Sequence, residues 1–267
     1  MNINESLWKL REKVRDTSPL VHNITNYVVM NTTANALLAI GASPVMAHAE
    51  AEVQDMVQIA SSLVINIGTL SPDWVNAMKL ALKKANQLNI PVVLDPVGAG
   101  ATPYRNQVLA ELLSAGKFSV IRGNASEIMA LVTTGNKTKG VDSTASSENA
   151  ETAAKFLNKK YGSVICISGA IDYIISKDKL VKISNGHSLM SKVTGMGCTA
   201  TALIGAFIGT GEDVFDSVVA ATAMMGIAGE LAAAVSKGPG SLQMNLLDKL
   251  HNMTKDEFIR TLRIECQ

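Results

Sequence analysis

The stretch Leu63-Val64-Ile65-Asn66-Ile67-Gly68 decides the class of fold. It is a short apolar run, rich in β-branched residues, that stops at a glycine, and this pattern predicts a buried strand. Ser71-Pro72-Asp73 follows, with a capping serine, a proline at the first helical position and an acidic residue in the first turn. A nearly continuous apolar strand followed by a helix is typical of a parallel sheet that helices cover on both faces.

The alternation of strand and helix signals continues along the chain. Further strands are predicted at residues 91–96, 118–121 and 164–168, and helices at residues 71–88, 104–113, 125–131 and 148–161. An amphipathic pattern predicts another helix at the N-terminus. This order predicts an α/β protein with a mostly parallel central sheet between two layers of helices. We find no repeat or linker and expect residues 1–267 to form one domain, with the polar stretch 135–147 as its loosest part.

The order of the signals changes after residue 168. Two short strands are predicted at residues 173–176 and 180–184, joined by a turn at Lys177-Asp178. Asn185-Gly186 is a hairpin signal before residues 187–193, so we expect a third strand there and an antiparallel meander at the edge of the sheet. Two long helices rich in small residues follow at residues 198–208 and 214–235, and shorter helices start at Leu242 and Lys255.

Composition excludes several classes of protein. The chain is 47% hydrophobic and 18% charged, which excludes a disordered chain or a coiled coil. Its net charge of +1 and 4% aromatic content argue against nucleic-acid or anionic membrane partners. Residues 218–235 are interrupted only by Thr222 and Glu230, but they are mostly Ala, Gly and Met, so we expect a buried helix rather than a membrane span. Three cysteines do not suggest a disulfide framework, and we expect a cytoplasmic protein.

Ligands of such sheets collect at the carboxyl ends of the strands. That rule places Gly68, Asp95 and the segments after residues 121 and 168 on one rim. Asp95 and Glu127 would offer two hard oxygen ligands from adjacent loops, which suits Mg²⁺. Arg122 could make bidentate phosphate contacts. The structural alternatives are a turn or cap for Asp95, a favourable helix-dipole interaction for Glu127 and a surface position for Arg122.

The segment Thr194-Gly195-Met196-Gly197-Cys198 opens directly into an apolar helix. Two glycines and a helix N-terminus can form a nest for an anion such as phosphate, although the glycines could instead only permit a tight turn. Cys198 could be a small buried residue, a nucleophile or a weak base whose pKa the helix end lowers. None of the four histidines belongs to a recognisable cysteine-hydrolase motif, which disfavours the nucleophile.

This glycine loop resembles the anion hole of ribokinase-like small-molecule kinases, with Cys198 where most members have an aspartate base. That departure, together with five motifs, resembles the hydroxyethylthiazole kinases; the motifs are residues 18–26 (SPLVHNITN), 41–46 (GASPVM), 66–70 (NIGTL), 94–100 (LDPVGAG) and 122–127 (RGNASE). The resemblance extends from about Pro19 to Ser241. It implies a ribokinase-like fold and ATP- and Mg²⁺-dependent phosphorylation of the primary alcohol of 4-methyl-5-(2-hydroxyethyl)thiazole, in thiamine biosynthesis and salvage.

The resemblance also assigns roles to residues. It implies that Gly195, Gly197 and Cys198 form the catalytic loop and that Asp95 and Glu127 hold Mg²⁺. The implied ATP contacts are Arg122, Ser168 and Thr194, and the implied thiazole contacts are Met46, Gly195, Asn26 and Gly68. Met46 could otherwise be ordinary core. The family forms trimers with active sites between subunits, so we expect a homotrimer.

Three other functions fit parts of this pattern. Related kinases of hydroxymethylpyrimidine or pyridoxal, and a nicotinamide-nucleotide hydrate dehydratase of the same fold, have aspartate at the position of Cys198. A non-catalytic nucleotide-binding module would not require both Asp95 and Glu127. These departures favour the thiazole kinase.

Overall fold

The computed structural model describes residues 3–133 and 147–267. The strands of these residues form one sheet in the order β2-β1-β3-β4-β5-β6-β7-β8-β9. Adjacent strands from β2 to β6 run parallel, and the pairs from β6 to β9 run antiparallel. The strands are β1 (Leu20–Ile24), β2 (Ser43–Val45), β3 (Ser62–Asn66), β4 (Val92–Asp95), β5 (Val120–Asn124), β6 (Val164–Ser168), β7 (Asp172–Ser176), β8 (Lys179–Ile183) and β9 (Ile264–Cys266).

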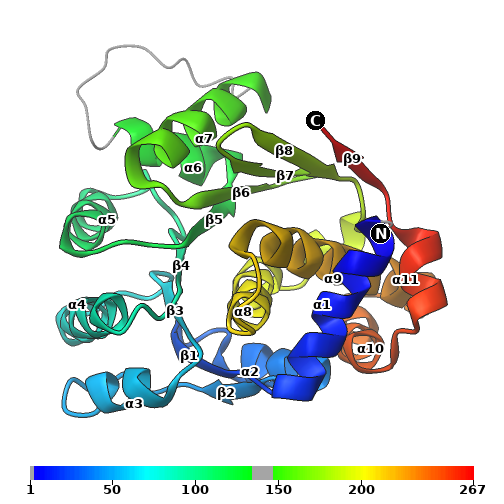
Figure 1. The fold of residues 1–267 in the computed structure, drawn as a ribbon, viewed down its shortest axis with the longest axis horizontal. Helices are drawn as coiled ribbons and strands as arrows, with labels where there is room; N and C mark the ends of the chain where they lie inside the picture. The colour runs from blue at the N-terminus through cyan, green and yellow to red at the C-terminus, as the bar shows by residue number, and fades with distance from the viewer. Residues whose placement is uncertain (1–2, 134–146) are drawn as a thin grey trace.

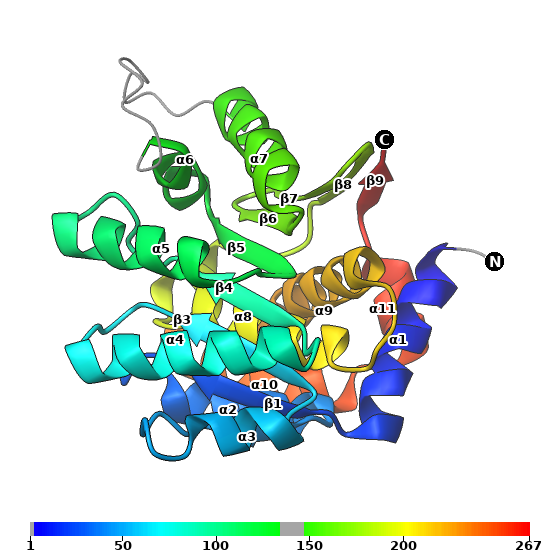
Figure 2. The ribbon, with the colours of Figure 1, turned by 60° about the vertical axis from the view of Figure 1, so that its left-hand side comes forward.

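Helices cover both faces of the sheet, which confirms the predicted α/β/α layers (Figure 1). One face carries α3 (Val53–Ile59), α4 (Pro72–Gln87), α5 (Pro103–Ala115), α6 (Ala125–Thr133) and α7 (Ser147–Tyr161). The other carries α1 (Ile3–Thr17), α2 (Met30–Ile40), α8 (Met196–Ile208), α9 (Val214–Val235), α10 (Pro239–Asn252) and α11 (Lys255–Thr261). Turning the molecule brings α4 and α5 forward, side by side across the first face (Figure 2).

The long apolar helix α9 lies in the core, as its small residues predict. By length and composition it could cross a membrane, with a mean hydropathy of 1.8 over its most apolar window. However, 72% of that window is buried inside the protein. Its side chains pack against α8, α10 and α1, within the hydrophobic core on that face of the sheet.

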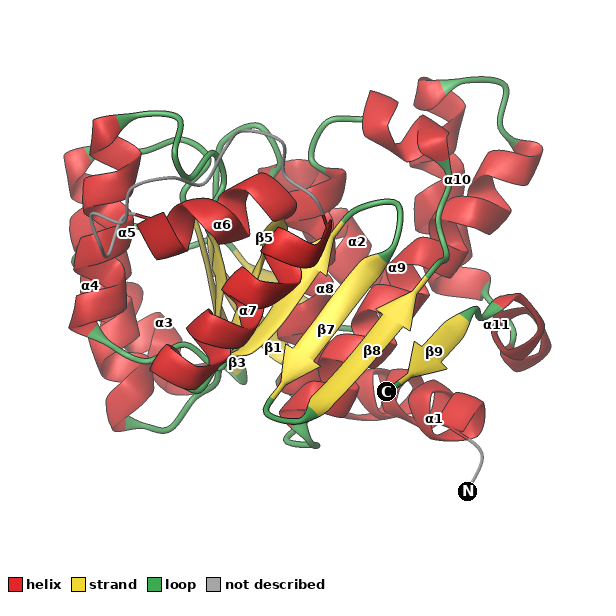
Figure 3. Cartoon of the chain, turned by 90° about the horizontal axis from the view of Figure 1, so that it is seen from above, coloured by secondary structure: helices red, strands yellow, loops and turns green. Residues whose placement is uncertain are grey.

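The predicted hairpin at Asn185-Gly186 is wrong. Residues Ser188–Lys192 form a 3-10 helix, and β9 takes the place beside β8 (Figure 3). The Asn185 side chain is buried and hydrogen-bonds Glu230, the Thr261 carbonyl and the Arg263 N–H, so it anchors the chain instead of turning it. The predicted antiparallel edge is therefore present, but its last strand comes from the C-terminal segment.

The parallel strands bring their carboxyl ends to one rim, as expected. Asn66 at the end of β3 is in register with Asp95 at the end of β4. Asn124 at the end of β5 is likewise in register with Ser168 at the end of β6. This shared edge positions the candidate site.

Candidate active site

A cavity of about 690 Å³ opens at this rim. It lies between the ends of β4, β5 and β6, the glycine loop before α8, and residues 185–191. The cavity brings together seven of the predicted site residues: Asp95, Arg122, Glu127, Ser168, Gly195, Gly197 and Cys198. Asn26, Met46, Gly68 and Thr194 are not among its lining residues. Thr194 is exposed, and Met46 is half-buried just beyond β2.

The glycine loop has the conformation that an anion nest requires. Gly195 precedes α8 with φ of 82°, a left-handed value that favours glycine. A Cβ at Gly197 would lie only 2.7 Å from Nη1 of Arg122, so this glycine lets the guanidinium approach the first turn of α8. No hydrogen bond or ion pair joins the Arg122 guanidinium to another described residue. Its guanidinium and the free N–H groups at the start of α8 can therefore bind one anion together.

Asp95 is the most buried acid of the cavity, with 1% of its surface exposed. Its Oδ2 accepts hydrogen bonds from Asn66 Nδ2 and from Thr201 Oγ1, each at 2.8 Å. Burial raises the pKa of Asp95 to about 6, while the positive charge of Arg122 and these hydrogen bonds act in the opposite direction. The carboxylate is thus held in a fixed orientation and is ionised at neutral pH.

Glu127 joins two loops of the rim through its carboxylate. Oε2 accepts a hydrogen bond from the Asn124 N–H, and the Asn124 side chain accepts one from the Glu127 N–H, which forms a capping box at the start of α6. Oε1 accepts from the Gly98 N–H at 2.8 Å, in the turn that follows β4. Glu127 therefore has a structural role, and a lone pair on each oxygen remains for a cation.

Cys198 lies in the first turn of α8, and its pKa is raised rather than lowered. Burial of the thiol is the largest cause, followed by the negative charge of Asp95. The expectation that the helix end lowers the pKa of Cys198 is therefore wrong, because burial and the negative charge of Asp95 raise this pKa. The Sγ atom accepts a hydrogen bond from Asn26 Nδ2 at 3.4 Å, which links Asn26 to the cavity.

Asn66 connects these groups, although the sequence analysis gave it no role. Its Oδ1 accepts hydrogen bonds from Asn26 Nδ2 and from the Gly68 N–H, each at 2.9 Å, while its Nδ2 donates to Asp95. The predicted residues Asn26 and Gly68 are thus joined to Asp95 through one buried amide. A polar residue inside the apolar stretch 63–67 was the signal that could have identified it, since buried polar groups are almost always hydrogen-bonded.

Arg105 and Asp172 were also missed. The Arg105 guanidinium donates to the Ile67 and Gly68 carbonyls after β3 and to the Val97 carbonyl after β4, and so holds two rim turns together. Asp172 lines the cavity and accepts a hydrogen bond from the Gly169 N–H at 2.9 Å. Burial raises the pKa of Asp172 to about 6.

The two acids of the rim, Asp95 and Glu127, suit a metal ion that takes most of its ligands from water and phosphate. No group of three or more His, Cys, Asp or Glu residues that could hold a metal ion occurs within residues 3–133 and 147–267. Asp95 and Glu127 together provide hard oxygen donors beside Arg122. Mg²⁺ is commonly bound by one or two carboxylates together with water and phosphate oxygens. The residues present therefore fit Mg²⁺ better than a metal that needs a complete protein cage.

Comparison with known proteins identifies the family. The sequence pattern of the Hydroxyethylthiazole kinase family matches residues 11–256. The chain belongs to this family. A hydroxyethylthiazole kinase of Syntrophus aciditrophicus is 54% identical over 261 residues, which cover 97% of each chain. A solved structure of the hydroxyethylthiazole kinase protein from Pyrococcus horikoshii is 42% identical, covers 98% of this chain and 99% of its own, and has a TM-score of 0.90.

A more distant likeness confirms the predicted class of fold. A ribokinase-like superfamily protein from Enterococcus faecalis has a TM-score of 0.62 at 14% identity, covering 90% of this chain and 88% of its own. At that identity the likeness concerns the fold alone. The ribokinase-like fold implied by the resemblance of the glycine loop and motifs is therefore confirmed, and the chain is a kinase by its family.

Proposed function

We propose that the chain transfers the γ-phosphoryl group of ATP to the primary hydroxyl of 4-methyl-5-(2-hydroxyethyl)thiazole, in thiamine biosynthesis and salvage. The observation that carries the proposal is the convergence of Arg122, Asp95 and the Gly195–Cys198 loop on one cavity, in a chain of the hydroxyethylthiazole kinase family. A guanidinium, a buried carboxylate and free helix N–H groups at one rim suit the binding of phosphate groups and the transfer of one of them.

Phosphoryl transfer has a loose transition state, so positioning and neutralisation of charge supply most of the rate. The N–H groups of the glycine loop and the Arg122 guanidinium would hold the negative charge that develops on the transferred group. Ser168 lines the same cavity and is assigned, with Thr194, to ATP. Asp95 and Glu127 would hold Mg²⁺, which neutralises phosphate charge when it is bound.

The acceptor alcohol is assigned to the side of Cys198 that faces Asn26. The Cys198 thiol with a raised pKa is a poor base at neutral pH, so the proposed mechanism does not depend on a thiolate. Gly68 joins Asn26 through the Asn66 amide, which supports a shared pocket on this side. Met46 lies apart from the cavity, and we assign it to the thiazole together with a neighbouring subunit.

We also propose that the chain acts as a cytoplasmic homotrimer with active sites between subunits. Two large apolar side chains that directly follow Asn26 are exposed, which supports a subunit contact there. Tyr27 and Val28 are 63% and 61% exposed, respectively. Sedimentation should give a trimer, and a catalytically active monomer would refute the shared site.

An ADP-release assay tests the reaction. The alcohols to compare are hydroxyethylthiazole, hydroxymethylpyrimidine and pyridoxal, each with ATP, Mg²⁺ and K⁺ or NH₄⁺. We expect ADP in proportion to phosphorylated thiazole alcohol, and the variants Asp95→Ala and Glu127→Ala should lose their response to Mg²⁺. Absence of ADP with hydroxyethylthiazole would refute the proposal, and ADP release only with another alcohol would reassign the substrate.

A further inference from the structure

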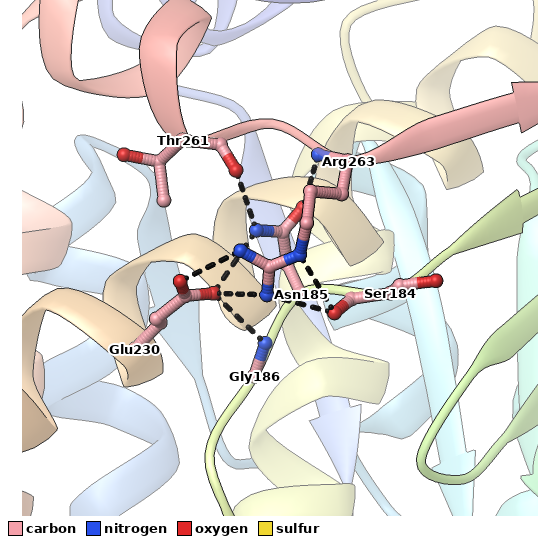
Figure 4. Close-up of polar contacts among 6 residues, drawn as sticks. All are labelled: Ser184, Asn185, Gly186, Glu230, Thr261 and Arg263. Carbon is pink, nitrogen blue, oxygen red and sulfur yellow. Dashed lines mark hydrogen bonds and ion pairs between the residues drawn. The ribbon is translucent and has the colours of Figure 1, made fainter.

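One wall of the cavity is held from outside by a polar network around Arg263 (Figure 4). The wall is the segment of residues 185–191, six of which line the cavity. Arg263, just before β9, donates from Nη1 and Nη2 to the two carboxylate oxygens of Glu230 on α9, at 2.8 and 2.7 Å. Such a bidentate pair fixes the orientation of both partners. Arg263 also donates from Nη2 to the Ser184 carbonyl at 2.9 Å.

The network reaches the wall through Asn185 and Gly186. Asn185 Nδ2 donates to Glu230 Oε2 at 3.1 Å and to the Thr261 carbonyl at 2.8 Å, and its Oδ1 accepts from the Arg263 N–H. The Gly186 N–H donates to the same carboxylate at 3.4 Å. Glu230 and the backbone of Thr261 and Arg263 thus fix both the Nδ2 and the Oδ1 of the Asn185 side chain.

Two glycines of α9 let the same wall pack closely against the helix. A Cβ at Gly226 would lie 2.8 Å from the Asn185 carbonyl oxygen, and a Cβ at Gly229 would overlap the Met190 sulfur. The wall therefore packs directly on the α9 backbone, and Glu230 is the next residue along that helix. Because the contact is close, a small shift of the wall would change the shape of the cavity.

The wall lines the same cavity as Arg122, Asp95 and the glycine loop, the groups that the proposed function assigns to the phosphates. Beside the wall, Met190, Met225 and Gly226 offer apolar surface to a flat base. We infer that the Glu230–Arg263 pair positions the 185–191 wall for the nucleoside part of ATP, and so sets nucleotide affinity from outside the cavity. This inference rests on the proposed function.

Titration calorimetry with a non-hydrolysable ATP analogue and Mg²⁺ tests the pair without any acceptor. We expect Arg263→Ala to raise the dissociation constant about 5- to 20-fold, and Glu230→Gln to raise it as well. Arg263→Lys keeps the charge and should cause a smaller rise than Arg263→Ala. In ADP-release assays the KM for ATP should rise in parallel, while kcat and the KM for the thiazole alcohol should change less than about 2-fold, because the pair touches no reacting atom.

Lys249→Ala is the matched control. The Lys249–Glu257 ion pair joins α10 to α11 in the same C-terminal part of the chain, with a distance of 2.9 Å. Neither residue lines the cavity, so Lys249→Ala should leave the dissociation constant of the analogue unchanged. Thermal unfolding of each variant reports its loss of stability.

Three results would overturn the inference. Unchanged analogue affinity in Arg263→Ala and Glu230→Gln would show that the pair does not act on the cavity. Equal weakening by Lys249→Ala would show that general loss of stability explains the effect. A wild-type chain that binds no nucleotide would overturn the proposed function together with this inference, whereas a chain that binds the analogue but phosphorylates no thiazole alcohol would overturn only the proposed function.

Discussion

Asn66 Nδ2 donates a 2.8 Å hydrogen bond to Oδ2 of Asp95, across the adjacent ends of β3 and β4. The other end of the same amide accepts from Asn26, which in turn donates to Cys198. One buried side chain therefore orients the acid of the phosphate end and the residue beside the proposed acceptor. It links the two halves of the proposed reaction.

Replacement of Asn66 should reduce both turnover and stability. Asn66→Ala leaves donors of Asn26 and Gly68 without their acceptor, and we expect a loss of about 1–3 kcal/mol in unfolding free energy. We also expect kcat to fall about 10-fold or more, because Asp95 loses one of its two fixing bonds. Steady-state kinetics and urea unfolding measure the two effects.

Asn86→Ala is the control for Asn66→Ala. The Asn86 side chain makes two hydrogen bonds, both to Lys117, where that of Asn66 makes three, and Asn86 lies on α4 and does not line the cavity. The Asn86→Ala variant should be less stable than the wild type but should have the same kcat. Equal kcat in the two variants would show that Asn66 is only structural.

Asp95→Asn should stabilise the free protein at neutral pH while it abolishes turnover. The folded pKa of about 6 lies above the ordinary value of 3.8, so the unfolded chain binds fewer protons between these values. The contribution of Asp95 to stability therefore falls as pH rises through this window. We expect a gain of about 1–3 kcal/mol at pH 7 that disappears near pH 4. Urea unfolding without nucleotide, at pH 7 and at pH 4, measures it.

The value of kcat/KM should fall as pH decreases through about 6. Asp95 must be ionised to hold a cation, and its protonation removes that charge. Asp172 also has a pKa raised to about 6 and lines the same cavity, so Asp172→Asn is the needed comparison. If kcat/KM still falls below about pH 6 in Asp172→Asn, the titrating group is Asp95. If this fall disappears in Asp172→Asn, the titrating group is Asp172.

Cys198→Ala should retain measurable turnover. The raised pKa keeps the thiol neutral at pH 7, so it does not supply a base. We expect kcat to fall less than about 100-fold, the lower end of what loss of a general base costs. The assay is ADP release with the thiazole alcohol. Turnover reduced to the uncatalysed rate would instead require Cys198 as a base or a nucleophile.

The fold was predictable wherever one residue pattern sufficed. Ser71 accepts a hydrogen bond from the Trp74 N–H and Pro72 begins α4, as the local sequence indicates. The capping box of Asn124 and Glu127 is also local. The candidate site was predictable where a polar residue lies at the carboxyl end of a strand, as Asp95 in β4 and Arg122 in β5 do, because parallel strands end at one rim.

The missed features depend on contacts between distant segments. Asn66 is a polar residue in an apolar run, but its partner Asp95 lies beside it only because β4 pairs with β3. Glu230 was noted only as an interruption of an apolar stretch, and its partner Arg263 lies 33 residues further along the chain. The three-residue strand β9 has too short a pattern to predict that it would replace the hairpin at Asn185.

The pairing of β9 with β8 joins Ile183 to Ile264 and closes a long loop that contains α8, α9, α10 and α11. Long loops cost more chain entropy to close, and an edge strand of three residues has few hydrogen bonds to offset it. Amide exchange should therefore detect the opening of β9 before the central strands open. Bound nucleotide that holds the wall in this position should slow that exchange, so the exchange rates of the C-terminal amides would report on nucleotide in the cavity.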